Sequence, residues 1–272
     1  MVYQGITPMR YSNNSSIKIY EFDNSYVITT FKIGTRALES ANPNNSFDFN
    51  TSINESGDLF DILKKDKSII ILIKNPVERF LSGGVQVTFE SASENTAAYS
   101  LARWGSEDYY FTTFLKKFVK NDISDSSIIY RRDFDLNNLK PFDESIELWK
   151  EWLSIVNFNI RIGNGHLSYY HRDCFQNLYK LISSIYDVRI IEDIEMRNID
   201  TFKEVTGKKY SSENFSNSIW KSYLRDNIID HTDNISNLSY INPLLITNQS
   251  ISIQKYLNDE YAFYGSFKKL IK

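Results

Sequence analysis

The chain has 272 residues, 42% of them hydrophobic and 15% aromatic, which excludes an intrinsically disordered chain and fits a single globular domain over residues 1–272. Its formal net charge of −3 does not favour a nucleic-acid partner. The single cysteine excludes an intramolecular disulfide, and one cysteine with three histidines cannot build a common structural zinc site without carboxylates.

The first predicted elements form a strand, a turn and a helix. Residues 26–31 (YVITTF) are rich in strand-forming side chains and predict a buried strand. A tight turn over 32–35 and a helix over 36–41 follow it. The polar segment 44–56 predicts a loop or an edge strand, and 59–65 predicts a short amphipathic helix.

Residues 68–73 (SIIILI) give the clearest strand signal in the chain. A nearly continuous β-branched run is typical of a parallel sheet that is covered on both faces. Pro76 ends this run and opens a helix over 77–81. Residues 87–108 have no clear pattern, and a mobile segment is one interpretation of them.

The second half of the chain is predicted to be mainly helical. Together the elements follow the order strand, helix, strand, helix, helix, strand, which predicts an α/β fold with helices around a central parallel sheet. The third strand is expected over 188–191. Helices are expected over 109–119, 145–156, 173–186, 201–205, 217–229 and 251–262.

No segment has the character of a membrane span or a secretory signal. The longest apolar run, 69–73, is far too short to cross a bilayer, and residues 1–16 lack an apolar signal core. We therefore expect a cytoplasmic protein without a membrane partner.

The turn after the first strand has the composition of an anion site. In residues 31–38 (FKIGTRAL), a strand end, one glycine and a helix start would direct backbone N–H groups toward a common point. Lys32, Thr35 and Arg36 add side-chain donors for phosphate or sulfate oxygens. The turn is not the P-loop of nucleoside triphosphatases, because its lysine precedes its only glycine. The alternative interpretation is an ordinary glycine turn with solvated charges.

A second basic turn follows the 68–73 strand. Lys74 lies at the carboxyl end of that strand, where open α/β sheets place their ligands. Ser82 falls one to two turns into the next helix, on the side that can face the same ligand. A cation and a hydroxyl that converge in this way fit a monophosphate, and the alternative is a capped helix with surface charges.

Together these turns resemble the two donor-binding elements of sulfotransferases that use 3′-phosphoadenosine 5′-phosphosulfate (PAPS). Residues 32–38 resemble the 5′-phosphosulfate loop, most of all that of carbohydrate (heparan sulfate-type) enzymes, and 70–82 resemble the 3′-phosphate element. Both occur in the family's order, and the close match covers 26–86. One departure is Lys74 in place of an arginine, which keeps the charge but loses bidentate geometry. Looser similarity to the family is found at 163–167, 188–194 and 261–267.

The resemblance implies a P-loop-like nucleotide-binding fold and a metal-free transfer of sulfuryl from PAPS to a hydroxyl or amine, with a carbohydrate as the preferred acceptor. It implies that Lys32 is catalytic and steadies the bridging oxygen as it leaves. It implies that Lys74 and Ser82 bind the 3′-phosphate, while Arg79 is either phosphate-proximal or structural. The donor contacts that it implies are Lys32, Ile33, Gly34, Thr35, Arg36, Ala37, Lys74, Arg79 and Ser82.

A hydroxyl acceptor also needs a general base. His166 is a candidate because an imidazole titrates in the useful range, and Glu55 is a candidate because the family's base lies a little beyond the first loop. His171 and Asp48 are the other candidates. The pair at 192–193 is interpreted as a helix cap after a strand.

Two other functions remain open on the sequence. A nucleotide-dependent phosphotransferase or kinase would need a triphosphate loop and a magnesium-binding carboxylate after a strand, and no convincing pair is found. A non-catalytic nucleotide-binding relative is the other alternative, because a lysine replaces the family's arginine at position 74 and no single residue is identified as the general base.

Overall fold

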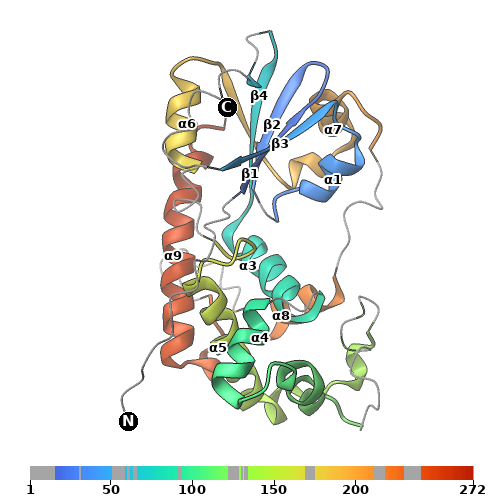
Figure 1. Ribbon diagram of the computed structural model, residues 1–272, viewed down its shortest axis with the longest axis vertical. Coiled ribbons are helices and arrows are strands. Elements are labelled where there is room, and N and C mark those ends of the chain that lie inside the picture. Colours follow the sequence, from blue (N-terminus) through green and yellow to red (C-terminus); the bar gives the residue numbers. More distant parts are fainter. Residues whose placement is uncertain are drawn as a thin grey trace.

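The computed structural model has a β-sheet at one end, a helical region at the other, and one long helix, α9 (Asn248–Lys268), beside both (Figure 1). No helix in the described part of the chain is long and apolar enough to cross a membrane. The structure describes residues 16–30, 32–50, 59, 62–63, 66–90, 94–121, 129, 131, 134–168, 175–210, 218–229 and 240–271.

The sheet has five strands in the order β3-β1-β2-β4-β5, and it is mixed, so the prediction of a parallel sheet is correct only for β2, β4 and β5. β1 pairs antiparallel with both β2 and β3. Only residues 22–24 separate β1 from β2, a connection too short for a parallel crossover. The strands are β1 (Ser16–Glu21), β2 (Ser25–Thr29), β3 (Asn45–Asn50), β4 (Ser68–Ile73) and β5 (Val188–Glu192).

The predicted strands at 68–73 and 188–191 are confirmed, the one predicted over 26–31 is confirmed with its end at Thr29, and the polar segment 44–56 contains the edge strand β3. Residues 69–73 of β4 are at most 4% exposed, as expected for a strand covered on both faces. Helices α1 (Thr35–Ser40) and α7 (Ile199–Thr206) lie on one side of the sheet, and α6 (Phe175–Ser183) and the end of α9 lie on the other (Figure 1).

The helical region has a hydrophobic core of its own, which contains Trp149, Trp152 and Trp220. Phe89 stacks on Trp220 with ring centroids 4.0 Å apart. This region is built from α3 (Pro76–Val85), α4 (Glu94–Trp104), α5 (Ile146–Arg161), α8 (Ile219–Asn227) and the first half of α9, with π-helical turns over Gln86–Glu90 and Tyr110–Phe114 and 3₁₀ turns over Leu115–Phe118, Leu136–Asn138, Phe142–Glu144 and Pro243–Leu245.

The interpretation of 87–108 as a mobile segment is wrong for its described residues, 87–90 and 94–108, because π-helical residues and the whole of α4 lie there. Val87 and Phe89 are at most 1% exposed and belong to the second core. A π turn shifts the apolar spacing away from 3.6 residues, so the helical period is hidden in the sequence. The helix predicted over 109–119 is a π turn followed by a 3₁₀ turn. The one predicted over 59–65 lies mostly outside the described residues, and the remaining predicted helices are confirmed with shifted ends.

Candidate functional site

The turn between β2 and α1 is held in an unusual backbone conformation. Lys32 and Gly34 both have φ of 67°, in the left-handed region. For a lysine this conformation costs about 1–2 kcal/mol. The Thr29 hydroxyl donates to the carbonyl of Ile33 at 2.5 Å and thereby stabilises the turn. A Cβ at Gly34 would lie 3.1 Å from Asp193 Oδ1, so a side chain is disfavoured there by space as well as by φ.

Lys32 connects the turn to the residue that follows β4 and to the residue that follows α3. Its carbonyl accepts a hydrogen bond from Lys74 Nζ at 3.0 Å, and its own Nζ donates to Gln86 Oε1 at 2.6 Å. Gln86 is 9% exposed and lies where α3 passes into the π turn. The ammonium group that the sequence predicts to be catalytic is therefore positioned by a residue that the sequence did not single out.

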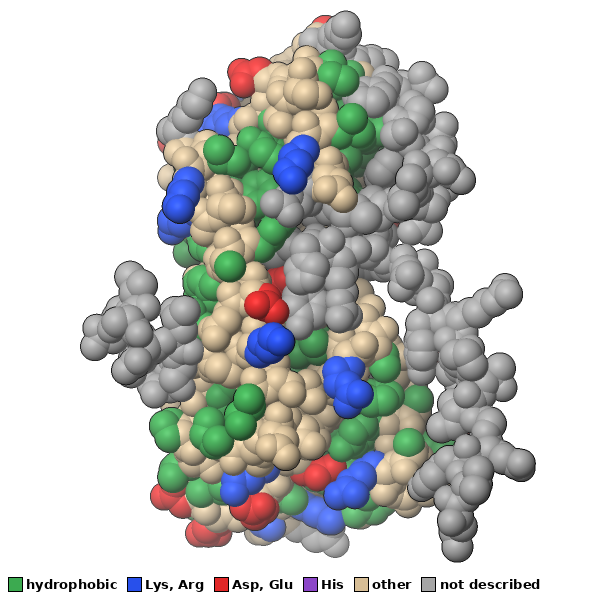
Figure 2. Space-filling model, turned by 90° about the vertical axis from the view of Figure 1, so that its left-hand side faces the viewer, with side chains coloured by type: hydrophobic (Ala, Val, Ile, Leu, Met, Phe, Trp, Pro, Cys, Tyr) green, Lys and Arg blue, Asp and Glu red, His purple; other side chains and the backbone are tan. Residues whose placement is uncertain are grey.

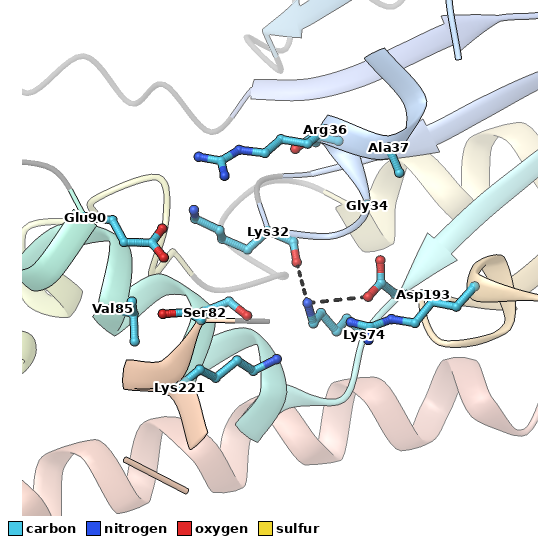
Figure 3. A pocket seen from close by; sticks show the side chains of 13 residues that line it. Lys32, Gly34, Arg36, Ala37, Lys74, Ser82, Val85, Glu90, Asp193 and Lys221 are labelled. Atoms are coloured by element: carbon cyan, nitrogen blue, oxygen red, sulfur yellow. Dashed lines mark hydrogen bonds and ion pairs between the residues drawn. The ribbon is translucent and has the colours of Figure 1, made fainter. Parts of the chain in front are cut away.

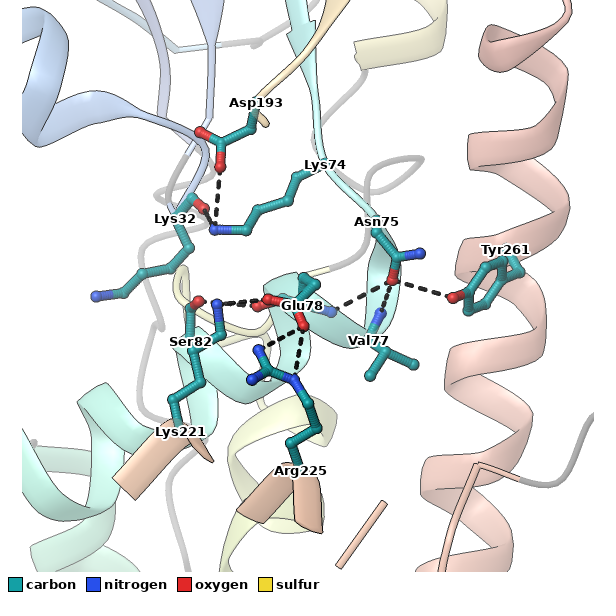
Figure 4. Close-up of polar contacts among 10 residues, drawn as sticks. All are labelled: Lys32, Lys74, Asn75, Val77, Glu78, Ser82, Asp193, Lys221, Arg225 and Tyr261. Atoms are coloured by element: carbon teal, nitrogen blue, oxygen red, sulfur yellow. Dashed lines mark hydrogen bonds and ion pairs between the residues drawn. The ribbon is translucent and has the colours of Figure 1, made fainter. Parts of the chain in front are cut away.

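The second turn begins helix α3 with a complete cap. Asn75 Oδ1 accepts from the backbone N–H groups of Val77 (3.0 Å) and Glu78 (3.3 Å), and from the Tyr261 hydroxyl at 3.0 Å (Figure 4). Pro76 is the first helical residue, as predicted. The cap fixes the chain directly after Lys74, so the direction of that lysine is set by α3 and α9 together.

Asp193 belongs to the site and is not a helix cap, which corrects the sequence interpretation of 192–193. Its backbone N–H donates to Ile73 O at 2.7 Å, and its Oδ2 lies 3.4 Å from Lys74 Nζ (Figure 4). The short helix that follows, Glu195–Arg197, has Ile194 at its N-cap position. Asp193 thus neutralises part of the charge of Lys74 beside the first turn.

The two predicted turns line one pocket between the sheet and the helical region (Figure 3). The pocket measures about 730 Å³ when the open space at its mouth is included. Five Lys and Arg side chains line it against two carboxylates, so its formal charge is positive although the chain is slightly acidic. Its lining residues are Lys32, Gly34, Thr35, Arg36, Ala37, Lys74, Ser82, Val85, Glu90, Asp193, Arg197, Ser218 and Lys221.

Basic side chains form no comparable cluster on the described part of the face that Figure 2 shows. On the described part of the face in Figure 2, Lys and Arg side chains are scattered among polar and apolar ones. The pocket, in contrast, brings five cations together in one hollow, an arrangement that suits a small anionic ligand.

Two of the predicted donor contacts do not line this pocket. Ile33 is fully buried in the core of the sheet region. Arg79 is 1% exposed, and its Nη1 lies 3.0 Å from Glu260 Oε2 and 2.5 Å from Ser168 O. Of the two roles that the sequence left open for Arg79, these contacts assign it the structural one.

A second cavity continues the pocket along the start of α3. It is about 1010 Å³ in size, open space included, and it shares Lys74, Asp193, Arg197 and Lys221 with the first. Within it, Glu78 binds Lys221 at 2.5 Å and Arg225 at 2.8 Å. Burial opposes ionisation of Glu78, but the hydrogen bonds from these two cations lower its pKa to about 2.

His166 lies near the pocket cations but does not line the pocket. Burial lowers the pKa of His166 to about 4, and the charges of Lys32 and Arg36 act in the same direction. Its loop packs directly on α3, since a Cβ at Gly83 would lie 2.3 Å from His166 O. The imidazole is therefore neutral at pH 7.

The other candidate bases that the sequence suggested are not among the described residues that line the pocket. Asp48 lies on the edge strand β3, exposed and 3.6 Å from Lys18 Nζ, and it does not line the pocket. Glu55 and His171 lie outside the described residues. Glu90, which the sequence analysis did not name, contributes a carboxylate to the pocket wall, on the side of Lys32 (Figure 3).

The residues that sequence reasoning missed come from distant segments. Gln86 and Glu90 lie in the π turn, Arg197 follows β5, and Ser218 and Lys221 begin α8. None of these positions carries a local motif. Among the described residues, no group of three or more His, Cys, Asp or Glu side chains is placed to hold a metal ion.

No model of a known protein family matches the chain, and neither a curated protein nor a solved structure matches it.

Proposed function

We propose that the protein is a PAPS-dependent sulfotransferase with the P-loop-like fold of that family. One observation carries the proposal: Lys32 and Lys74, 42 residues apart in the chain, reach the same cationic pocket, and the Lys74 ammonium binds the Lys32 carbonyl. Two basic strand-to-helix corners in one pocket fit a nucleotide that carries a charged group at each end.

The residues have distinct roles in the proposed reaction. The acceptor oxygen forms a bond to sulfur while the bond from sulfur to the 5′-phosphate oxygen breaks, and the nucleotide leaves as 3′-phosphoadenosine 5′-phosphate (PAP). Lys32 would offset the charge on the leaving oxygen, and the hydrogen bond from its Nζ to Gln86 holds the ammonium in place before the reaction. Thr35 and Arg36, at the start of α1, line the same end of the pocket.

The proton of the acceptor hydroxyl needs a base. His166 is neutral and able to accept it, but a pKa of about 4 makes it a weak base. A bound phosphosulfate would offset the charges of Lys32 and Arg36 and so raise the pKa of His166. Glu55 remains a candidate, and Glu90 joins it because its carboxylate lines the pocket.

Calorimetry tests donor identity. We expect wild-type protein to bind PAP in preference to ATP, and Lys32→Ala and Lys74→Ala each to weaken PAP binding at least tenfold, since each removes a charge-assisted contact. Lys203→Ala is the matched control, because Lys203 is exposed on α7. Preference for ATP would favour a phosphotransferase instead.

Transfer of labelled sulfate from PAPS tests the reaction itself. Carbohydrates with free hydroxyl or amine groups are the first acceptors to assay, because the first loop most resembles that of carbohydrate enzymes. PAP binding without transfer to any acceptor of a broad panel would identify a non-catalytic relative.

A further inference from the structure

Helix α8 begins at the pocket with a serine that does not act as a cap. Ser218 occupies the N-cap position of this nine-residue helix, yet its side chain makes no capping hydrogen bond. It is 7% exposed, and its Oγ is buried with no hydrogen-bond partner in the described part of the chain. A serine in this position normally accepts a hydrogen bond from the first turn, and an unpaired buried hydroxyl is destabilising. Ser218 lines the pocket, so a ligand there could supply the missing partner.

Lys221 lies one turn further along α8 and faces the same space. Its side chain is 15% exposed and lines both cavities, as Lys74 does. Burial lowers the pKa of Lys221, and the charge of Lys74 adds to this effect. The two ammonium groups therefore repel each other across the pocket, and an anion between them would relieve that repulsion.

The contacts of Glu78 leave Lys221 able to turn toward such an anion. Arg225 donates to Glu78 Oε1 through both Nε (3.2 Å) and Nη2 (2.8 Å). If Lys221 moved to a ligand, the carboxylate would still be paired by the guanidinium, so no buried charge would be left uncompensated.

We propose that the N-terminus of α8, through Ser218 and Lys221, completes with Lys74 the binding site for the 3′-phosphate of the donor nucleotide. The inference rests on the proposed function. The two lysines decide which end of the nucleotide is meant: Lys221 and Lys74 line both cavities, whereas Lys32 and Arg36 line the first cavity alone. Ser218 lines the first cavity and is assigned to the same end as Lys221 because it lies one turn before that lysine on α8. Ser82, whose hydroxyl donates to Glu78 O at 2.8 Å, would share the site after turning from its own helix.

The test compares two nucleotides that differ only in the 3′-phosphate, namely PAP and adenosine 5′-phosphate. We expect Lys221→Gln and Ser218→Ala each to weaken PAP binding, about tenfold or more for the lysine and severalfold for the serine, with binding of adenosine 5′-phosphate unchanged. Ser222→Ala, an exposed serine on the same helix, should bind both nucleotides like wild type. Lys32→Ala should weaken both.

Three results would overturn the inference while the proposed function stands: PAP binding that depends on Lys32 but is unchanged in both α8 variants, an equal loss for the two nucleotides in a folded variant, or a loss in the Ser222 control of the same size. If Lys221→Gln fails to fold by circular dichroism, Ser218→Ala decides alone, because it removes one oxygen from a position without partners. Absence of PAP binding in wild type would instead refute the proposed function.

Discussion

Replacing Glu260 with glutamine would remove the carboxylate from its buried ion pair with the guanidinium of Arg79. Both side chains are 1% exposed, and Nη1 and Oε2 lie 3.0 Å apart. Removing one partner of a buried ion pair costs about 3–5 kcal/mol. Because Arg79 would keep its hydrogen bond to Ser168 O, we expect the lower end, about 3 kcal/mol. At roughly 2–4 °C per kcal/mol, the melting temperature would fall by about 6–12 °C.

The double variant Arg79→Met with Glu260→Leu removes both charges and tests whether the role of Arg79 is structural. Urea unfolding of wild type, Arg79→Met, Glu260→Leu and the double variant forms a double-mutant cycle. We expect a coupling energy of about 2–3 kcal/mol between the two side chains. The double variant should bind PAP with the wild-type affinity, because Arg79 does not line the pocket. The structural role is refuted if Glu260→Gln unfolds at the wild-type urea concentration. It is also refuted if the folded double variant binds PAP tenfold more weakly.

Three further predictions concern the pocket. The pKa of His166 is about 4 when folded against about 6.5 when unfolded, so its contribution to stability is present above pH 6.5 and is lost toward pH 4. Urea unfolding should show a loss of about 3 kcal/mol between these limits, and His166→Asn should abolish this loss. Gly34→Ala should weaken PAP binding more than tenfold in calorimetry, whereas Gly207→Ala, with φ of 68° but open space around its Cβ, should only lower the melting temperature. Gln86→Leu removes the hydrogen bond between Gln86 and the Lys32 ammonium, and it should lower the turnover of PAPS severalfold with little change in PAP affinity, measured by sulfate transfer and calorimetry.

Local sequence signals predicted the strands and turns that carry the two motifs. The run at 68–73 specifies β4 because every residue in it after the first is buried, and Pro76 marks the first turn of α3. The order of the strands in the sheet could not be predicted from local sequence patterns. β1 lies between β2 and β3, and its pairing with the polar strand β3 is a long-range contact that a local pattern does not encode.

The pocket wall opposite the motifs was not predictable for a related reason. Glu78 and Arg225 are 147 residues apart, yet they bind each other through two hydrogen bonds at the start of α3. Ser218 and Lys221 reach the pocket only because α8 packs on α3. Isolated polar residues on a helix are normally solvated, so their role emerges from tertiary packing alone.

The cationic pocket lies where two separately packed cores meet, and this position determines how its two halves are held. Lys32 follows the sheet core, whereas Ser82 lies on α3 of the helical core. Tyr261 of α9 packs against both cores and donates its hydroxyl to Asn75, the cap that follows Lys74. The spacing between the two basic corners is set by the pairing of β2 with β4, whereas the long C-terminal helix fixes the start of α3 without lining the pocket. A ligand that contacts both Lys32 and Ser82 must therefore favour the arrangement of the two cores that α9 maintains.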